Sequence, residues 1–238
     1  MEKLIYPLWK HDHQSVDQLR DALLTGLRPH LDEDKNTVAA RLAVADSAVA
    51  SAARRVIANR KNLPDGMLSL WINQSEARVA LEQQLDLLVG RFTGYLVTES
   101  EPLPNTSHRA LPGERVYGMC QVVFLTCPPR LSEAEWLHRW QEEHTQVAID
   151  TQATFGYRQN VIVRPLCPEA SPVSAVVEEN FPPEAMVSDH AFYGADDDPT
   201  LAANMDAMIK SCARFIDFDK IDVIPMSEYV LRDTGQRR

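Results

Sequence analysis

The order of the predicted helices and strands repeats once along the chain, and this repeat constrains the fold more than any other feature of the sequence. In the second half, β-branched and apolar runs alternate with amphipathic stretches in the order strand, helix, strand, strand, helix, strand. The predicted elements of this half are strands over 119–126, 157–166, 186–193 and 221–231, and helices over 132–151 and 199–215. The segment 168–183, which contains four prolines, is predicted to be a loop.

The first half gives the same order with weaker signals. Its predicted strands are 4–9, 38–49, 67–72 and 94–98, and its predicted helices are 15–30 and 75–89. A stretch rich in Pro, Asn, Ser and Gly separates the halves and indicates a linker. The chain therefore divides into an N-terminal unit (1–101), a linker (102–116) and a C-terminal unit (117–238).

Two tandem βαββαβ units follow the split-βαβ, ferredoxin-like plan, and the predicted fold class is α+β. In such a unit the two helices cover one face of the sheet and leave the other face bare. Two units in one chain can bury both bare faces against each other. The sequence thus predicts a barrel formed within one chain by two sheets packed face to face.

The charge balance excludes several classes of partner. The 238 residues include 24 Lys and Arg against 34 Asp and Glu, a net charge of −10, and no basic run is longer than two residues. Proteins that bind nucleic acids or anionic membrane surfaces carry a basic footprint, so neither partner is expected. The N-terminus lacks the layout of a signal peptide, and no apolar stretch approaches the ~20 residues that span a bilayer. A cytoplasmic location is expected.

The cysteines and motifs argue against a metal centre, a redox dithiol or a bound nucleotide. The four cysteines form no C-x-x-C pair, and the chain has no G-x-G-x-x-G, P-loop or H-E-x-x-H motif. The sequence therefore predicts neither a metal nor a cofactor.

The helix predicted over 132–151 places a histidine among tryptophans. At ~100° per residue, Trp136, Trp140 and His144 share one face, whereas His138 points away from it. His144 could be a core histidine that is hydrogen-bonded to a neighbour, or a general acid or base in a pocket lined by both tryptophans. An imidazole suits the second role because its reference pKa of ~6.5 makes both protonation states accessible near neutrality. The residues alone leave both interpretations open.

Two residues on the strand predicted over 186–193 are further candidates. Strict alternation puts Asp189 and Tyr193 on one face and His190 on the other. Asp189 could orient His144, because a carboxylate on a buried face needs a partner, and His190 could act inside the barrel. The alternative for each residue is a strand-end position in water.

Three tyrosines, Tyr117, Tyr157 and Tyr229, lie at predicted strand ends. A phenol in such a position can line the mouth of a barrel and donate a hydrogen bond to a developing enolate or phenolate oxygen. Packing in the core is the other explanation for each of them.

The second half resembles a known family. Residues 136–144, with Trp140 and His144 in an aromatic-x-x-x-His pattern, and the aromatic-led strand start at 155–157 resemble EthD-like members of the dimeric α/β-barrel superfamily. The segments 189–193 and 227–230 are also similar to that family, whereas the first half has leucines where the motif would lie. The resemblance implies a dimeric α/β-barrel closed within one chain, with any family-type site confined to the second half. Relatives include ether-degradation accessory proteins, polyketide cyclases and dehydratases, cofactor-free monooxygenases and lactone isomerases.

We therefore expect the second half to bind an apolar or aromatic small molecule. The predicted catalytic residues are His144, Asp189, Tyr157 and His190, and the predicted substrate-binding residues are Trp136, Trp140, Tyr193, Tyr229 and Tyr117. The first hypothesis is acid/base catalysis without a cofactor, as in dehydration, cyclisation or isomerisation of an aromatic or polyketide-like carbonyl compound. The alternatives are a cofactor-free monooxygenase or oxidoreductase, and a non-catalytic binding or accessory protein. A second polar group within reach of His144 favours catalysis, and a lone histidine favours binding only. The sequence leaves a homodimer open.

Overall fold

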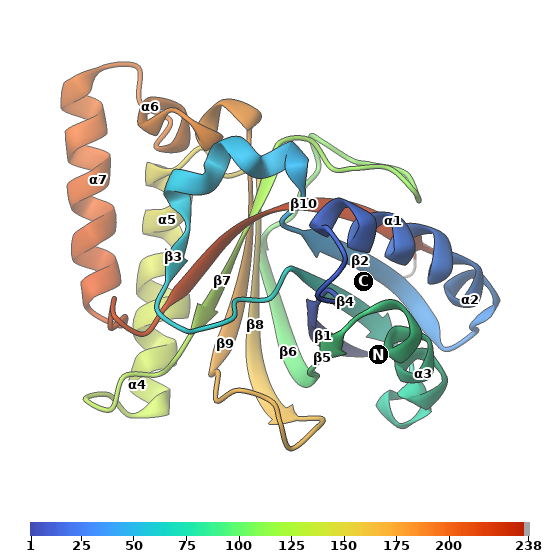
Figure 1. Ribbon diagram of the computed structural model, residues 1–238. Helices are drawn as coiled ribbons and strands as arrows, with labels where there is room; N and C mark the ends of the chain where they lie inside the picture. The colour runs from blue at the N-terminus through green and yellow to red at the C-terminus, as the bar shows by residue number, and fades with distance from the viewer. Residues whose placement is uncertain (236–238) are drawn as a thin grey trace.

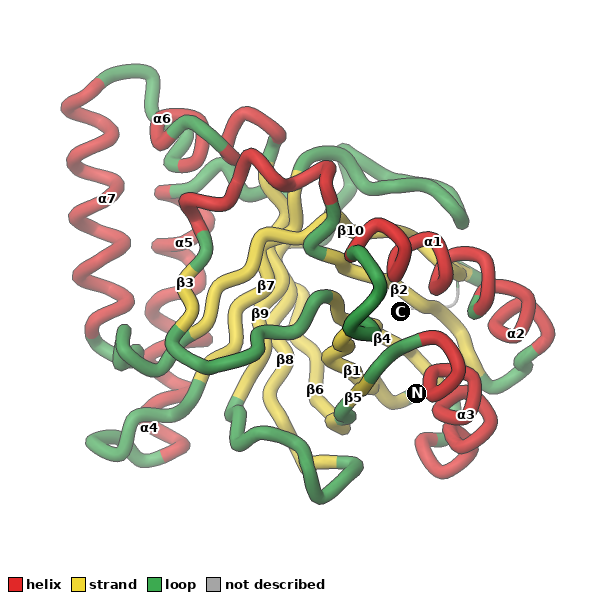
Figure 2. The backbone as a smooth tube through the Cα atoms, in the orientation of Figure 1, coloured by secondary structure: helices red, strands yellow, loops and turns green. Residues whose placement is uncertain are grey.

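Eight antiparallel strands close into a barrel at the centre of the computed structural model, which describes residues 1–235 (Figures 1 and 2). The strands of the first half are β1 (Glu2–Trp9), β2 (Thr37–Val44), β4 (Gly66–Ile72) and β6 (Tyr95–Leu103). Those of the second half are β7 (Met119–Leu125), β8 (Gly156–Pro165), β9 (Ala175–Phe181) and β10 (Asp222–Asp233). Their hydrogen-bonded order is β2-β4-β1-β6-β8-β9-β7-β10, and β10 pairs with β2 to close the ring. The predicted single-chain barrel is confirmed, and its halves are joined by the ladders β6–β8 and β10–β2.

Helices cover the outside of this barrel in two groups (Figure 1). The first half supplies α1 (Val16–Gly26), α2 (Arg28–Glu33), α3 (Val79–Leu88) and the 3-10 segments η1 (Ser47–Arg55) and η2 (Ser75–Arg78). The second half supplies α4 (Glu133–Leu137), η3 (His138–His144), α5 (Thr145–Thr151), η4 (Pro183–Met186), α6 (Asp189–Phe192) and α7 (Asp198–Ala213). Two short strands, β3 (Ile57–Ala58) and β5 (Arg91–Phe92), pair with β10 and β1. Within residues 1–235, no helix combines the length and apolar character that a membrane crossing requires.

The layer between the first-half sheet and its helices is filled with leucine side chains. Leu4 of β1 lies opposite Leu70 of β4, and both pack with Leu23 of α1 and Leu85 of α3. All four side chains are completely buried. Because burying a leucine contributes roughly 1.5–3 kcal/mol, this layer is a main source of stability for the first half.

The largest departure from the predicted elements lies between residues 168 and 193. Strand β9 occupies part of the segment predicted as a loop, and it pairs along its whole length with β7. The segment predicted as a strand over 186–193 instead holds the end of η4 and the helix α6. Ser188 begins that helix, since its side chain accepts a hydrogen bond from the backbone N–H of Ala191.

The barrel interior contains paired charges. Lys3 Nζ lies 2.9 Å from Glu178 Oε2, and Arg158 Nη2 lies 2.6 Å from Glu228 Oε1. Burial alone would raise the pKa of Glu178, but Arg158 and Lys3 lower it to about 2. These ion pairs satisfy the charges that the barrel encloses.

Candidate active site

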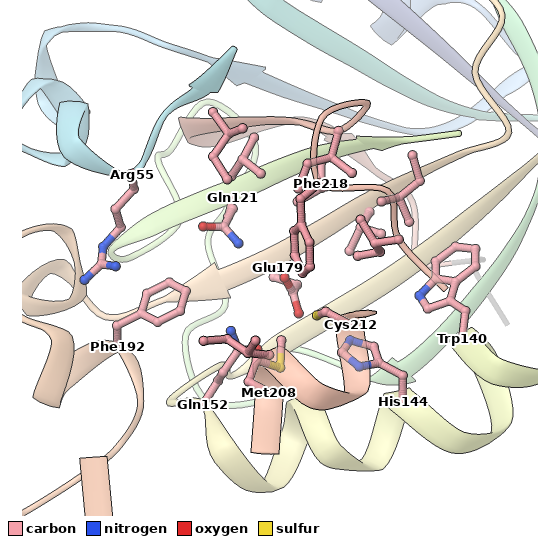
Figure 3. Close-up of a pocket in the computed structure, with 18 of the residues that line it drawn as sticks. Arg55, Gln121, Trp140, His144, Gln152, Glu179, Phe192, Met208, Cys212 and Phe218 are labelled. Atoms are coloured by element: carbon pink, nitrogen blue, oxygen red, sulfur yellow. The ribbon is translucent and has the colours of Figure 1, made fainter. Parts of the chain in front are cut away.

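A cavity of about 320 Å³ lies between the outer face of the second-half sheet and the helices packed on it (Figure 3). Most of its wall is apolar, with contributions from Val123, Trp140, Val177, Met208, Phe215 and Val223. This volume falls at the lower end of the range for pockets that bury a small ligand.

One carboxyl group points into this cavity. In the β7–β9 ladder Glu179 lies opposite Gln121, and both residues line the cavity. Glu179 is 5% exposed, and burial raises its pKa to about 7, an effect that a hydrogen bond with Gln121 opposes. Among residues 1–235 no cationic side chain forms an ion pair with Glu179, in contrast to neighbouring Glu178. A carboxyl group that is close to half-ionised near neutral pH is suited to remove a proton from a bound molecule.

His144 also lines the cavity, as an uncharged base. Its Nδ1 lies 2.9 Å from Ser211 Oγ of α7, and its ring centroid lies 4.8 Å from that of Phe215. Burial lowers its pKa to about 4, so the imidazole is neutral at pH 7. Figure 3 shows the ring directed toward Cys212 and the cavity. His144 can therefore exchange neutral hydrogen bonds with a ligand, whereas Glu179 is the better proton acceptor.

A widened helical turn separates Trp140 from His144. Segment η3 is a π-helix, in which the N–H of Thr145 bonds to the carbonyl of Trp140. Such turns occur often at functional sites. Trp140 Nε1 donates to Tyr157 Oη over 3.2 Å, and Gln159 Nε2 donates to the same oxygen over 3.1 Å. Burial raises the pKa of Tyr157, so it stays a protonated phenol at the base of the cavity.

The structure brings four of the predicted site residues to the cavity wall and leaves the others elsewhere. Trp140, His144, Tyr157 and Tyr193 line the cavity. Trp136 is instead buried behind Trp140, where its Nε1 donates to a backbone carbonyl of the loop after α7.

Two predicted binding tyrosines lie outside the cavity. Tyr229 is on the outer face of β10, where its Oη donates to Asp46 Oδ2 over 2.6 Å. Tyr117 is 45% exposed and stacks on His108 at a centroid distance of 4.4 Å.

The strand predicted to carry Asp189 and His190 does not form, and both residues lie on α6. Asp189 Oδ1 accepts hydrogen bonds from Arg54 and Arg55 and does not contact His144. His190 Nε2 lies 3.0 Å from Asp198 Oδ1 at the surface, so it does not act inside the barrel.

Sequence reasoning missed Glu179 and the contribution of the first half. The run 175–181 has strand-forming residues at both ends, but its acidic centre interrupts the apolar pattern on which the prediction relied. Arg54, Arg55 and Ile57 extend the cavity wall from the first half, a contribution that the expectation of a site confined to the second half does not include.

Comparisons with known proteins show the fold. No family model and no curated protein matches the sequence. Among solved structures, an anthrone oxidase-like protein superposes with a TM-score of 0.54 at 9% identity, covering 98% of this chain and 94% of that one. Monooxygenase-like proteins from Lactobacillus acidophilus (TM-score 0.50, 8% identity, 95% and 93% covered) and Fusobacterium nucleatum (TM-score 0.50, 7% identity, 97% and 92% covered) are also similar. This chain therefore has the dimeric α/β-barrel fold.

Proposed function

We propose that the cavity is the active site of an enzyme that oxidises an aromatic carbonyl or phenolic compound with O₂, and that Glu179 begins the reaction by removing a proton. The observation that carries this proposal is a buried carboxyl group, with a pKa of about 7 and no cationic partner among residues 1–235, on the wall of an apolar cavity.

The first step breaks an acidic C–H or O–H bond of the substrate. The proton moves to the Glu179 carboxylate, and the electron pair delocalises onto the substrate oxygen as an enolate or phenolate. Neutral His144 and the phenol of Tyr157 are polar groups of the cavity wall that can hydrogen-bond to such an oxygen. The electron-rich anion can then reduce O₂: conversion of an activated methylene to a carbonyl consumes one O₂ and releases one water.

One observation supports the oxidative outcome over a rearrangement. The similar folds include an anthrone oxidase-like and two monooxygenase-like proteins, although similarity at this identity concerns the fold and not the reaction. The proton abstraction needs only residues of this chain. Dehydration, cyclisation and isomerisation begin with the same proton abstraction. These reactions form the second candidate function, and Glu179 would be the base in each of them.

We also retain two finer assignments as proposals. The strand orders β6-β1-β4-β2 and β8-β9-β7-β10 support a description of the halves as tandem ferredoxin-like units. The aromatic-x-x-x-His pattern at Trp140 and His144 supports an EthD-like origin for the second half.

Oxygen uptake tests the proposal, with anthrone as the first probe in a panel of tricyclic ketones and phenols. We expect Glu179→Gln to reduce the rate by about 10²–10⁴-fold, the usual range for a general base. Glu184→Gln, the same substitution at an exposed position on η4, should stay within about twofold. The wild-type rate should rise as the pH increases through about 7, because the carboxylate form is active.

The other outcomes separate the alternatives. Equal rates for wild type and Glu179→Gln would remove Glu179 from the mechanism. Conversion of a probe without O₂ uptake would indicate a dehydratase, cyclase or isomerase. Saturable binding without conversion of any probe would indicate an accessory protein.

A further inference from the structure

Two arginines from the first half lie at the end of the cavity away from His144. Arg54 and Arg55 end the segment η1 and line the cavity. Both donate to one oxygen of Asp189, Arg54 Nη2 over 2.7 Å and Arg55 Nη2 over 3.1 Å. Figure 3 shows Arg55 beside Phe192 on one side, Trp140 and His144 on the other, and Glu179 between them. The cavity thus has a cationic end, a central carboxyl group and an apolar end.

The guanidinium of Arg55 is held rigidly and has a free donor edge. Its side chain is 11% exposed, and the group lies over the ring of Phe192 at 4.2 Å. Its Nε donates to the carbonyl of Ala185, and its Nη2 donates to the carbonyl of Ser188 and to Asp189. Within residues 1–235 no hydrogen bond is made by Nη1. A planar guanidinium fixed in this way binds a carboxylate at a small entropic cost.

The charges at this end do not cancel. Two guanidinium groups share one carboxylate, that of Asp189, which leaves one positive charge in excess. This is a local exception in a chain whose net charge is −10. Among the described residues of the cavity wall, Glu179 is the single carboxyl group, and it lies away from Arg55 in the middle of the cavity (Figure 3).

We infer that Arg54 and Arg55 bind a carboxylate group of the substrate, so that the substrate is an aromatic carbonyl compound that also carries a carboxylic acid. Asp189 is the internal carboxylate with which that group exchanges or shares the two guanidinium groups. That the rest of the ligand is aromatic follows from the proposed function, and this part of the inference rests on it. The anion site itself rests on the arginine geometry alone.

Binding of 2-naphthoate and of its neutral counterpart 2-naphthamide, measured by calorimetry on the whole protein, tests this inference. We expect wild type to bind naphthoate about 10-fold or more tightly than naphthamide, since hydrogen bonds between a guanidinium and a carboxylate are stronger than those to a neutral amide. Arg55→Gln should remove most of this preference and leave naphthamide binding within about twofold. Asp189→Asn should tighten naphthoate binding several-fold, because it frees both arginines from the internal carboxylate.

Control variants keep the outcomes distinct. If Arg55→Gln does not fold, Arg54→Gln, which changes a half-exposed side chain, provides a second test of the naphthoate preference. Arg109→Gln removes the same charge at an exposed position outside the cavity and should change neither affinity.

Equal affinities of wild type for both probes, or a naphthoate preference that survives both cavity variants, would overturn the anion site and leave the proposed function standing. If neither probe binds, the cavity is not a site for aromatic compounds, and both proposals fail. A naphthoate preference combined with full activity of Glu179→Gln would support the anion site and overturn the proposed function.

Discussion

The two halves of the barrel place different side chains at corresponding positions between sheet and helices. In the first half, the facing pair Leu4 and Leu70 is completely buried among other leucines. In the second half, the outer positions of the corresponding strands hold Gln121 and Glu179, and a cavity of about 320 Å³ takes the place of packed hydrocarbon.

The helices differ in the same way. Helix α3 buries Leu85 completely, whereas its counterpart α7, also between the third and fourth strands of its half, has no fully buried residue. The cavity side of α7 carries Met208, Ile209 and Cys212 instead. At these positions the first half has tightly packed leucines, which stabilise the fold. The second half has looser packing around a cavity that contains a carboxyl group without an ion-pair partner among the described residues.

The largest effect on stability should come from placing a carboxyl group in the first half, at the position that corresponds to Glu179. Leu70→Glu puts a carboxyl at a position that is completely buried among leucines, and we expect a loss of more than about 4 kcal/mol or no folded protein. Leu70→Met, which conserves volume, should cost less than about 1.5 kcal/mol. Urea unfolding followed by circular dichroism measures both. A Leu70→Glu protein as stable as Leu70→Met would show that the first-half layer is as adaptable as the second.

Truncating the paired helices should give unequal losses. Leu85→Ala should destabilise by about 2–5 kcal/mol, because it leaves a void in a packed layer. Met208→Ala should cost about 1 kcal/mol or less, since part of its side chain already faces the cavity. The comparison uses the same unfolding experiment, and equal losses would contradict it.

Removing the charge at position 179 should stabilise the protein in a pH-dependent way. The folded-state pKa of Glu179 is raised to about 7, so its destabilising effect is absent at low pH, appears as the pH rises above about 4.5 and is complete above 7. The stability of Glu179→Gln relative to wild type should therefore increase by roughly 3 kcal/mol from pH 4 to pH 8. Melting temperatures across this range provide the measurement, with Glu184→Gln as the control. A difference that does not change with pH would mean that Glu179 is not buried as a lone carboxyl.

The smallest effect is expected for His144→Ala. At pH 7 it should cost about 1 kcal/mol, because Ser211 loses one partner beside a cavity that water can enter. The folded-state pKa of His144 is lowered to about 4, so wild type loses the stability it has above pH 6.5 as the pH falls toward 4. The cost of the variant should shrink over that interval and reverse in sign near pH 4, because lowering the pKa from 6.5 to about 4 corresponds to roughly 3 kcal/mol. A loss of several kcal/mol at pH 7 would instead identify His144 as a structural core residue.

The sequence predicted the barrel and most of its elements because their apolar spacing matches their burial. The helix from Ser132 and the strands at 119–125 and 222–231 follow that rule. Strand β9 does not follow it. Glu178 is buried inside the barrel, where Lys3 and Arg158 pair with it, and Glu179 is buried on the wall of the cavity. The residues that pair with Glu178 and those that form the cavity around Glu179 are distant in sequence, so the local pattern of apolar residues could not reveal these environments.

The same limit explains the errors at the site. His144 and Trp140 were found because they share one helix, but the arginines of η1 reach the cavity only after the barrel has closed. Asp189 was matched with His144 through a strand that does not form, and its actual partners are those arginines.

The ladders β6–β8 and β10–β2 have one more consequence, which concerns symmetry. In a barrel built from two identical chains, every substitution occurs twice, and closure weakens on dilution. In this chain the linker between β6 and β7 makes closure intramolecular, so the barrel does not depend on protein concentration. A destabilising residue such as Glu179 therefore occurs once per barrel, and the corresponding position in the first half keeps its leucine, Leu70.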